Sequence, residues 1–415
     1  MIVATLLTAS VAASISACSG SSGSADSPDP VGTTAGTAPT TGGDPPGVVV
    51  STVTDPVDPA VDPADPATSG DPAATPTTVA DGPLIEVCDA TIVVQISDLP
   101  SAHVGALYEL QGPSATTDGS GTSSGPLVRP DGTVEDVVLE IRSGGPVVDF
   151  DSSVDLLASD PSIDLAVAPL PEIVASVGAG DGVTGVVSLT DVSSSMILWD
   201  PATYPTVTSL RDLADADVEI QHRPGAAVID VLVANGTLDE GELSDVYFGE
   251  PAAFVAAQGA IAQQGDALVD PFLLPSLPQW GRPVEFALAA EAGWASYDDV
   301  VAVRTSELEA HAACLGRFVP MVQDAIAAYV SDPTATDQRI AALRAEINPL
   351  TRIDPVLLDQ GVSAGVESGI FAVSPNGLGG FDQERVDAVL TSLSTSADPS
   401  TSPVTNRFIA SDRTL

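Results

Sequence analysis

Short runs of β-branched and apolar residues recur along the second part of the chain, and stretches with helical spacing lie between them. The strand-like runs occupy residues 91–96, 137–141, 163–168, 183–189, 218–220 and 300–303. Helical spacing occurs at 226–234, at 308–329 and after Asp382. Because strand-like and helical segments alternate, the pattern predicts an α/β fold.

The expected helices have recognisable ends. Pro224-Gly225 precedes the first helix, and Asn235-Gly236 follows it. Residues 306–309, Ser-Glu-Leu-Glu, have the sequence of a capping box before the second helix, and we expect Pro320 to bend that helix. The last helix places four apolar residues on one face: Val386, Val389, Leu390 and Leu393.

The N-terminus has the pattern of an export signal. Residues 2–13 are an apolar run too short to span a bilayer, and Ile-Ser-Ala precedes Cys18. This segment resembles a bacterial lipobox, so we expect residues 1–18 to be a lipoprotein signal peptide and Cys18 to carry the lipid. An ordinary signal peptide with a coincidental cysteine is the alternative.

A tether and a folded body follow. Residues 19–83 are rich in Ser, Gly, Thr, Ala and Pro, repeat Asp-Pro, and contain no basic residue. Proline restricts the residue before it and the aspartates repel one another, so we expect an extended, disordered spacer. Residues 84–415 are long enough for one two-lobed α/β unit.

Composition excludes several classes of function. The chain of 415 residues carries 13 Lys+Arg and 57 Asp+Glu, a formal net charge of -44, and every basic residue is arginine. Binding to nucleic acid or to an anionic membrane surface needs clustered cations, so neither is expected. Without lysine, a Schiff base, a pyridoxal phosphate linkage and a phosphate-binding P-loop are excluded.

Cysteine usage points to one disulfide. Besides Cys18, the chain contains only Cys88 and Cys314. Outside the cytoplasm these two residues are free to pair, which would link the start of the first strand to a late helix. Two separate buried thiols are the alternative.

The search for catalytic and metal-binding motifs yields none. Residues 121–125, Gly-Thr-Ser-Ser-Gly, match the serine-hydrolase pattern, but we expect them in a loop and not between a strand and a helix. The three histidines lack metal-ligand spacing, and the acidic turn at 149–155 lacks the glycine and final glutamate of an EF-hand. No enzyme activity, cofactor or metal is therefore expected.

Several segments carry a resemblance to a known family. They are residues 94–100 and 105–108, 247–256, 280–284, 314–320 and 376–382. In this order they resemble the NMT1/THI5-like (SsuA/ThiY-like) solute-binding lipoproteins of actinobacterial ABC importers. The resemblance covers nearly all of residues 84–393. It implies a type II periplasmic-binding fold, with two α/β lobes joined by two crossover strands and a ligand cleft between them.

The resemblance also implies domain limits and a binding surface. The first lobe would comprise 84–190 and 300–415, the second lobe 191–299, and the crossovers would lie near 188–195 and 297–303. Four loops would face the cleft, because loops at strand C-termini and helix N-termini present N–H groups to a ligand. The expected ligand-binding residues are Ser97, Asp98, Leu99, His103, Tyr108, Pro169, Leu170, Pro224, Gly225, Ala226, Gly249 and Glu250.

The first of these loops departs from the family pattern. Where relatives carry an acidic-Trp-Phe-Pro sequence, this chain has Ser-Asp-Leu-Pro at 97–100, so aromatic stacking on a planar ligand would be lost. The family includes binders of pyrimidine precursors, riboflavin, sulfonates and nitrate. Asp98 and Glu250, if they face the cleft, favour a neutral or cationic ligand over an anion.

The resulting hypothesis is an extracytoplasmic receptor, anchored to the cell membrane by its lipid and monomeric. It would capture a small organic nutrient, such as a pyrimidine, a flavin or a sulfonate-like compound, and deliver it to an ABC permease and its ATPase. Two alternatives stay open: an extracytoplasmic enzyme on the same fold and a degenerate sensing receptor. The absence of lysine weighs against the enzyme, because the enzymatic branch of this fold uses a lysine-bound cofactor.

Overall fold

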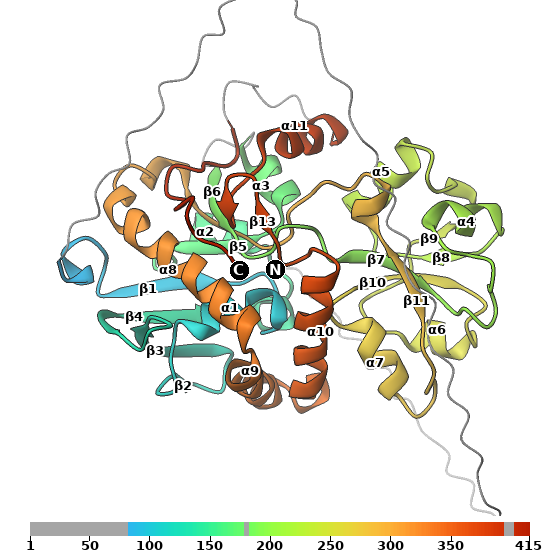
Figure 1. The fold of residues 1–415 in the computed structure, drawn as a ribbon, viewed down its shortest axis with the longest axis horizontal. Helices are drawn as coiled ribbons and strands as arrows, with labels where there is room; N and C mark the ends of the chain where they lie inside the picture. The colour runs from blue at the N-terminus through green and yellow to red at the C-terminus, as the bar shows by residue number, and fades with distance from the viewer. Residues whose placement is uncertain (1–81, 178–181, 394–401) are drawn as a thin grey trace, which may run out of the picture. The chain divides into compact units, whose positions relative to one another are not determined.

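The computed structural model describes residues 82–177, 182–393 and 402–415. The expected lipidation site, Cys18, and the expected tether lie outside the described residues. The described chain forms two main sheets and a small hairpin, with helices between the strands (Figure 1). The expected α/β class is confirmed.

The first sheet has seven strands. Its spatial order is β2 (Thr116–Thr117), β3 (Thr122–Val128), β4 (Val134–Arg142), β1 (Thr91–Gln95), β5 (Leu165–Ala168), β12 (Val300–Arg304) and β6 (Val183–Ser188). Strands β4, β1 and β5 are parallel, and β12 runs antiparallel to both of its neighbours. The C-terminal segment continues this sheet at its edge, because Val404 forms a bridge with Gly185 of β6.

The second sheet has five strands. Its order is β11 (Glu285–Leu288), β7 (Ser195–Trp199), β10 (Ala262–Asp266), β8 (Ile220–Gln221) and β9 (Leu243–Ser244). Strand β7 is antiparallel to β10 and β11, whereas β10, β8 and β9 are parallel. The remaining hairpin pairs β13 (Val373–Ser374) with β14 (Gly377–Leu378).

The two sheets share one topology. In the first, β12 lies between β5 and β6; in the second, β7 lies between β10 and β11. Each of these antiparallel strands follows a segment that leaves the other sheet, residues 189–194 before β7 and residues 289–299 before β12. We call these segments the first and the return crossover. The expected fold class of two α/β lobes joined by two crossover strands is confirmed, and the repeated topology is invisible in the sequence.

Helices pack on both faces of the first sheet and beside the second. They are α1 (Gly105–Glu109), α2 (Ser153–Ser159), α3 (Leu170–Val177), α4 (Leu210–Asp215), α5 (Ala227–Ala234), α6 (Ala252–Ala256), α7 (Asp270–Ser276), α8 (Ala312–Ser331), α9 (Thr334–Ile347), α10 (Pro355–Glu367) and α11 (Gln383–Ser392). Short 3₁₀ turns are η1 (Leu84–Glu86), η2 (Ala102–Val104), η3 (Gly145–Val148), η4 (Glu240–Glu242), η5 (Ala289–Ala292), η6 (Thr305–Glu307) and η7 (Pro349–Thr351).

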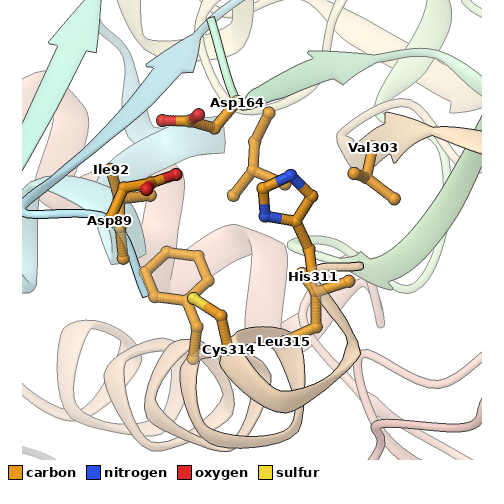
Figure 2. Close-up of a pocket in the computed structure, with 9 residues that line it drawn as sticks. Asp89, Ile92, Asp164, Val303, His311, Cys314 and Leu315 are labelled. Carbon is orange, nitrogen blue, oxygen red and sulfur yellow. The ribbon is translucent and has the colours of Figure 1, made fainter. Parts of the chain in front are cut away.

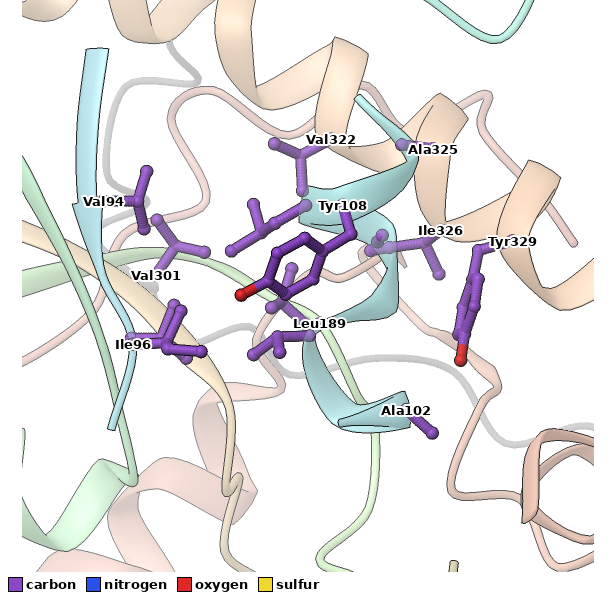
Figure 3. Packing of buried hydrophobic residues seen from close by; sticks show 14 of the residues in the cluster. Val94, Ile96, Ala102, Tyr108, Leu189, Val301, Val322, Ala325, Ile326 and Tyr329 are labelled. Atoms are coloured by element: carbon purple, nitrogen blue, oxygen red, sulfur yellow. The ribbon is translucent and has the colours of Figure 1, made fainter. Parts of the chain in front are cut away.

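Burial on both faces explains the continuous apolar runs of the central strands. On β12, Val301 and Val303 pack in one hydrophobic cluster with α1 and α8, whereas Val300 and Ala302 pack in another with α2 and α11. Figure 3 shows the first of these clusters, in which Tyr108 of α1 lies among aliphatic side chains. A strand covered on both faces needs apolar residues at every position.

Cys88 and Cys314 form a disulfide in this structure. Cys88 precedes β1, and Cys314 lies in the first turn of α8. The bond joins residues 226 positions apart in the chain. It therefore links the first strand of the sheet to the long helix that covers it.

Two local expectations are wrong. Residues 122–125 belong to strand β3, which pairs antiparallel with the next strand, β4, so this pairing and not the local Thr-Ser-Ser-Gly sequence makes the segment a strand. The expected capping box at 306–309 does not begin a helix: η6 ends at Glu307, and α8 begins at Ala312 without a side-chain cap. Pro320 lies inside α8, which continues past it because its apolar face is buried against the first sheet.

Candidate functional site

A histidine of the first lobe joins both the second lobe and the return crossover. His103 lies in η2, in the loop after β1. Its Nε2 atom is 2.7 Å from Asp266 Oδ2 at the end of β10, and its Nδ1 atom is 3.0 Å from Asp299 Oδ2 just before β12. The side chains of His103 and Asp299 are 13% and 9% exposed, whereas that of Asp266 is 35% exposed, so the contact with Asp299 is the better shielded from water.

The two carboxylates decide the protonation of this histidine. Burial disfavours the charged imidazolium, but Asp266 and then Asp299 outweigh it and raise the pKa of His103 well above its ordinary value. Burial likewise opposes ionisation of Asp266, yet His103 holds the pKa of that carboxyl below its usual range. The pair is therefore an imidazolium–carboxylate bridge at neutral pH.

The same region holds the two crossovers together. Asp299 Oδ2 accepts a hydrogen bond from Thr190 Oγ1 at 3.3 Å, which joins the return crossover to the first. Asp298 Oδ2 accepts hydrogen bonds from Ser193 Oγ at 2.7 Å and from Ser194 N at 3.1 Å. Burial and the neighbouring Asp299 raise the pKa of Asp298 to about 6. These bonds join the two crossovers to each other.

Asp270 extends the polar cluster into the second lobe. Its Oδ2 accepts a hydrogen bond from Asp266 N at 2.8 Å, and the residue is 5% exposed. Burial, together with the nearby charge of Asp266, raises the pKa of Asp270 to about 7. Gly265 provides the space for this carboxyl, because a Cβ at that position would lie 2.6 Å from Asp270 Oδ2.

An arginine and an aromatic ring of the second lobe lie over each other, and the charge of the arginine lowers the pKa of Asp270 against the effect of burial. The Arg223 guanidinium is 5.9 Å from the centre of the Tyr247 ring, and Tyr247 is 5% exposed. The Tyr247 backbone N–H donates to the His222 carbonyl at 3.1 Å, which fixes the loop before α6 against the loop before α5. The site is thus built from His103, Asp266, Asp270, Asp299, Arg223 and Tyr247, which we call the interlobe cluster.

Some residues expected from the sequence lie in or beside this cluster. His103 is one of its members. Gly249 and Glu250 follow Tyr247 and are exposed, and a Cβ on Gly249 would lie 3.4 Å from Arg223 Nη2. Pro224, Gly225 and Ala226 form the loop between β8 and α5, immediately after Arg223.

Other expected residues lie elsewhere. Tyr108 is completely buried among aliphatic side chains (Figure 3), and Leu170 is completely buried in the other hydrophobic cluster of the first sheet, so neither side chain is accessible to a ligand in this structure. Leu99 is 7% exposed. The Asp98 side chain accepts a hydrogen bond from Leu99 N, and the Asp98 carbonyl oxygen accepts one from Gly144 N. Ser97 accepts a hydrogen bond from Gly145 N, and Pro169 precedes α3 and is half-buried.

No motif in the sequence marks the acidic members of the cluster. Asp266 ends a strand, Ala-Gln-Gln-Gly-Asp, that has no alternation of apolar and polar residues. Asp298 and Asp299 immediately precede the strand predicted at 300–303, and this position at a strand end is the feature of the sequence that could have indicated a functional site. Among many acidic residues, only tertiary structure distinguishes the ones that face His103.

A small hollow lies at the N-terminal edge of the parallel strands, away from the interlobe cluster. It is a cavity of about 20 Å³ beside Cys314, bordered by Asp89, Asp164 and His311 (Figure 2). Asp164 Oδ2 accepts a hydrogen bond from Val93 N at 2.7 Å, so this carboxylate already has a structural role. The cavity has room for about one water molecule and none for an organic solute.

The described residues contain neither a metal-binding group of side chains nor a membrane-spanning helix. No group of three or more His, Cys, Asp or Glu side chains in residues 82–177, 182–393 and 402–415 is arranged to hold a metal ion. In the same part of the chain, no helix combines the length and apolarity needed to cross a bilayer.

Comparisons with known proteins found similarity only among solved structures. No family model and no curated protein matches the sequence. The periplasmic aliphatic sulphonate binding protein SsuA from Escherichia coli is 14% identical, with a TM-score of 0.48 over 74% of this chain and 86% of its own. An ABC transporter protein from Parabacteroides distasonis is 11% identical, with a TM-score of 0.47 over 78% and 100%. The periplasmic nitrate-binding protein NrtA from Synechocystis PCC 6803 is 15% identical, with a TM-score of 0.41 over 66% and 70%.

Proposed function

We propose that this chain is an extracytoplasmic solute-binding protein that captures a small organic molecule between its lobes and delivers it to an ABC permease. The observation that carries the proposal is the contact of His103, from the first lobe, with Asp266 of the second lobe and Asp299 of the return crossover. A polar site shared between two lobes and their connection is the arrangement that lets ligand binding control a hinge.

The proposed cycle follows from these contacts. In the open state, the bond between His103 and Asp266 would be replaced by bonds to water, while the crossovers would keep the lobes connected. A solute that contacts both lobes stabilises the closed state by its differential affinity for that state. The crossovers stay joined by Thr190–Asp299 and Ser193–Asp298, so the rotation is confined to the neighbouring backbone.

The finer features of the proposal concern its surroundings. Residues 1–18 would direct export, Cys18 would carry a lipid that anchors the protein outside the cytoplasm, and residues 19–83 would act as the tether. The two lobes would comprise 84–190 with 300–415, and 191–299. The protein would act as a monomer without enzymatic activity, with a pyrimidine, a flavin or a sulfonate-like compound among the solutes to be tested.

The test is a binding screen on the full chain. Thermal unfolding is measured with pyrimidines, flavins, sulfonates, nitrate, polyamines and amino-acid derivatives, and small-angle scattering then follows closure with each compound that binds. A ligand at 100 times its Kd stabilises the folded state by about 2.7 kcal/mol. Saturable stabilisation with a fall in the radius of gyration supports the proposal. A well-folded protein that no compound stabilises would contradict it.

A further inference from the structure

A wide hollow lies on the second lobe, apart from the interlobe cluster. Its volume is about 380 Å³, within the range of small-molecule sites, and it is lined by α4 and by residues 236–240 between α5 and η4. These segments precede β8 and β9, whereas Asp266, which contacts His103, ends β10, and the three strands are parallel. The hollow therefore lies at the opposite edge of this sheet, and we call it the outer hollow.

The outer hollow is lined by charges of both signs. Arg211 and Asp215 are four positions apart on α4, a spacing at which opposite charges often pair. Neither side chain forms an ion pair or a hydrogen bond in the part of the chain that the structure describes. Glu240 and Asp239 add two carboxylates from the loop, and Asp239 uses only Oδ1, which accepts Gly241 N at 2.9 Å. One guanidinium and three carboxylates are thus available to a solute.

A buried hydroxyl points to a ligand independently of these charges. Thr237 lines the outer hollow and is only 7% exposed, yet its hydroxyl forms no hydrogen bond within the described ranges. Its backbone N–H, by contrast, donates to Asn235 Oδ1 at 3.0 Å. Buried polar groups are normally hydrogen-bonded, so an unpartnered hydroxyl in the wall of a hollow is available to a bound molecule.

The loop that carries Thr237 is held in place by hydrogen bonds. Its N–H and that of Leu238 donate to the Leu232 carbonyl at 2.8 and 3.0 Å. Asn235 Nδ2 donates to the Ala292 carbonyl at 2.9 Å, which ties the loop to the start of the return crossover. A wall fixed in this way loses little conformational entropy when a ligand binds.

We propose that the outer hollow binds a zwitterionic α-amino acid, with Arg211 receiving its carboxylate. A guanidinium binds a carboxylate through two parallel N–H bonds. Asp215 and Asp239 accept the ammonium protons, and the Thr237 hydroxyl supplies a further donor or acceptor. Because three carboxylates face one guanidinium, an amino acid with a cationic side chain, such as lysine, balances the charge best. This site is separate from the proposed solute cleft.

The charges disfavour other classes of ligand. An anion would leave the three carboxylates uncompensated, and a simple amine would leave Arg211 without a partner. No group of three or more His, Cys, Asp or Glu side chains in residues 82–177, 182–393 and 402–415 is arranged to hold a metal ion. Glu242 adds to the negative side, because its Oε2 is buried without a partner, and burial, then Asp239, Asp217 and Asp215, raise its pKa.

The experiment compares three matched probes on the full chain by calorimetry. L-lysine has both charged ends, cadaverine lacks the carboxylate, and ε-aminocaproate lacks the α-ammonium group. L-lysine should bind about tenfold or more tightly than either analogue. Arg211→Gln should weaken L-lysine binding by about tenfold or more and leave cadaverine binding unchanged.

A control variant and a second readout locate the site. Arg352→Gln removes an exposed guanidinium after η7, outside the outer hollow, and should bind L-lysine as the unmodified protein does. In hydrogen-exchange mass spectrometry, L-lysine should protect residues 210–216 and 234–242 and leave the loop at 97–104 unchanged.

Each outcome supports or overturns the inference. L-lysine binding that Arg211→Gln weakens and Arg352→Gln does not, with protection of 210–216 and 234–242, supports it. No binding of L-lysine, equal binding of cadaverine, or protection confined to 97–104 overturns it, and none of these results decides the function proposed for the cleft. If Arg211→Gln does not fold by circular dichroism, Asp215→Asn replaces it and should weaken L-lysine and cadaverine binding alike.

Discussion

His103 of the first lobe and Asp266 of the second are joined by a 2.7 Å contact between Nε2 and Oδ2, although 163 positions separate them in the chain. The bond is charge-assisted, because the carboxylate keeps the imidazole protonated. Because His103 Nδ1 also contacts Asp299, this one side chain contacts both the second lobe and the return crossover.

Replacing this histidine should loosen the contact between the lobes. His103→Gln keeps some hydrogen-bonding capacity but removes the positive charge, and it leaves Asp266 and Asp299 close together without compensation. We expect the ligand-free variant to have a larger radius of gyration by small-angle scattering and about 2 kcal/mol less stability in denaturant. His311→Ala, outside the cluster, is the control. An unchanged radius in His103→Gln would contradict the bridging role.

The contribution of His103 should depend on pH in a defined direction. Its folded-state pKa is raised above the unfolded value of about 6.5, so the stabilisation is complete below that pH and is lost as pH rises through the folded pKa. The groups that act on it are Asp266, Asp299 and Asp298. The difference in free energy of unfolding between the unmodified protein and His103→Gln should therefore be larger at pH 6 than at pH 10. A difference that grows with pH would refute this sign.

Helix α10 lies against both α7 and η2, so it contacts elements of both lobes (Figure 1). The contact depends on Gly361, because a Cβ there would overlap the carbonyl oxygen of Leu268. Gly361→Ala should destabilise the protein by about 1–3 kcal/mol and weaken closure. Gly316→Ala in α8 meets nothing within 4 Å, so it should instead stabilise the helix by about 0.5–1 kcal/mol. Denaturant titration of both variants is the measurement, and equal effects would argue against the contact.

The disulfide between Cys88 and Cys314 should stabilise the body strongly. It closes a loop spanning 226 positions, and loop entropy predicts a contribution of about 5 kcal/mol as an upper value. The Cys88→Ser, Cys314→Ser variant should unfold at lower denaturant than the oxidised protein, and reduction of the unmodified chain should have a similar effect. Mass spectrometry of the exported protein without reduction identifies the bond. Recovery of two free thiols would contradict the pairing.

Asp337 is a buried carboxyl outside the cleft that should make stability depend on pH. Its Oδ1 accepts the Tyr329 hydroxyl at 2.7 Å, its Oδ2 has no partner, and burial raises its pKa to about 7. A raised folded pKa means that the protonated form is favoured, so stability falls as pH rises from about 4 to 7. Asp337→Asn should reduce this fall by a few kcal/mol at most, as measured by urea unfolding at pH 5 and 8. An unaltered pH profile would show that the carboxyl is ionised throughout.

Local chemistry in the sequence was sufficient for several elements. Residues 91–96, 163–168 and 300–303 are mainly apolar, and each coincides with a central strand buried on both faces. The helix after Asp382 was also predictable, because the Asp382 side chain caps α11 by accepting from Glu384 N. Strands β7, β10 and β11 were missed because the pairing that stabilises them joins distant segments.

What the sequence by itself determined is the α/β class, the number of cysteines and the excess of acidic residues over basic ones. The composition excluded lysine chemistry, and the apolar runs located most strands of the first sheet. Only the tertiary structure decided which acidic residues form the site. Asp266, Asp270 and Asp299 resemble any other aspartate in the sequence, and they acquire their role because two crossovers bring β10, α7 and β12 to the loop that carries His103. Electrostatic interactions depend on distance and burial, and neither is encoded in local sequence.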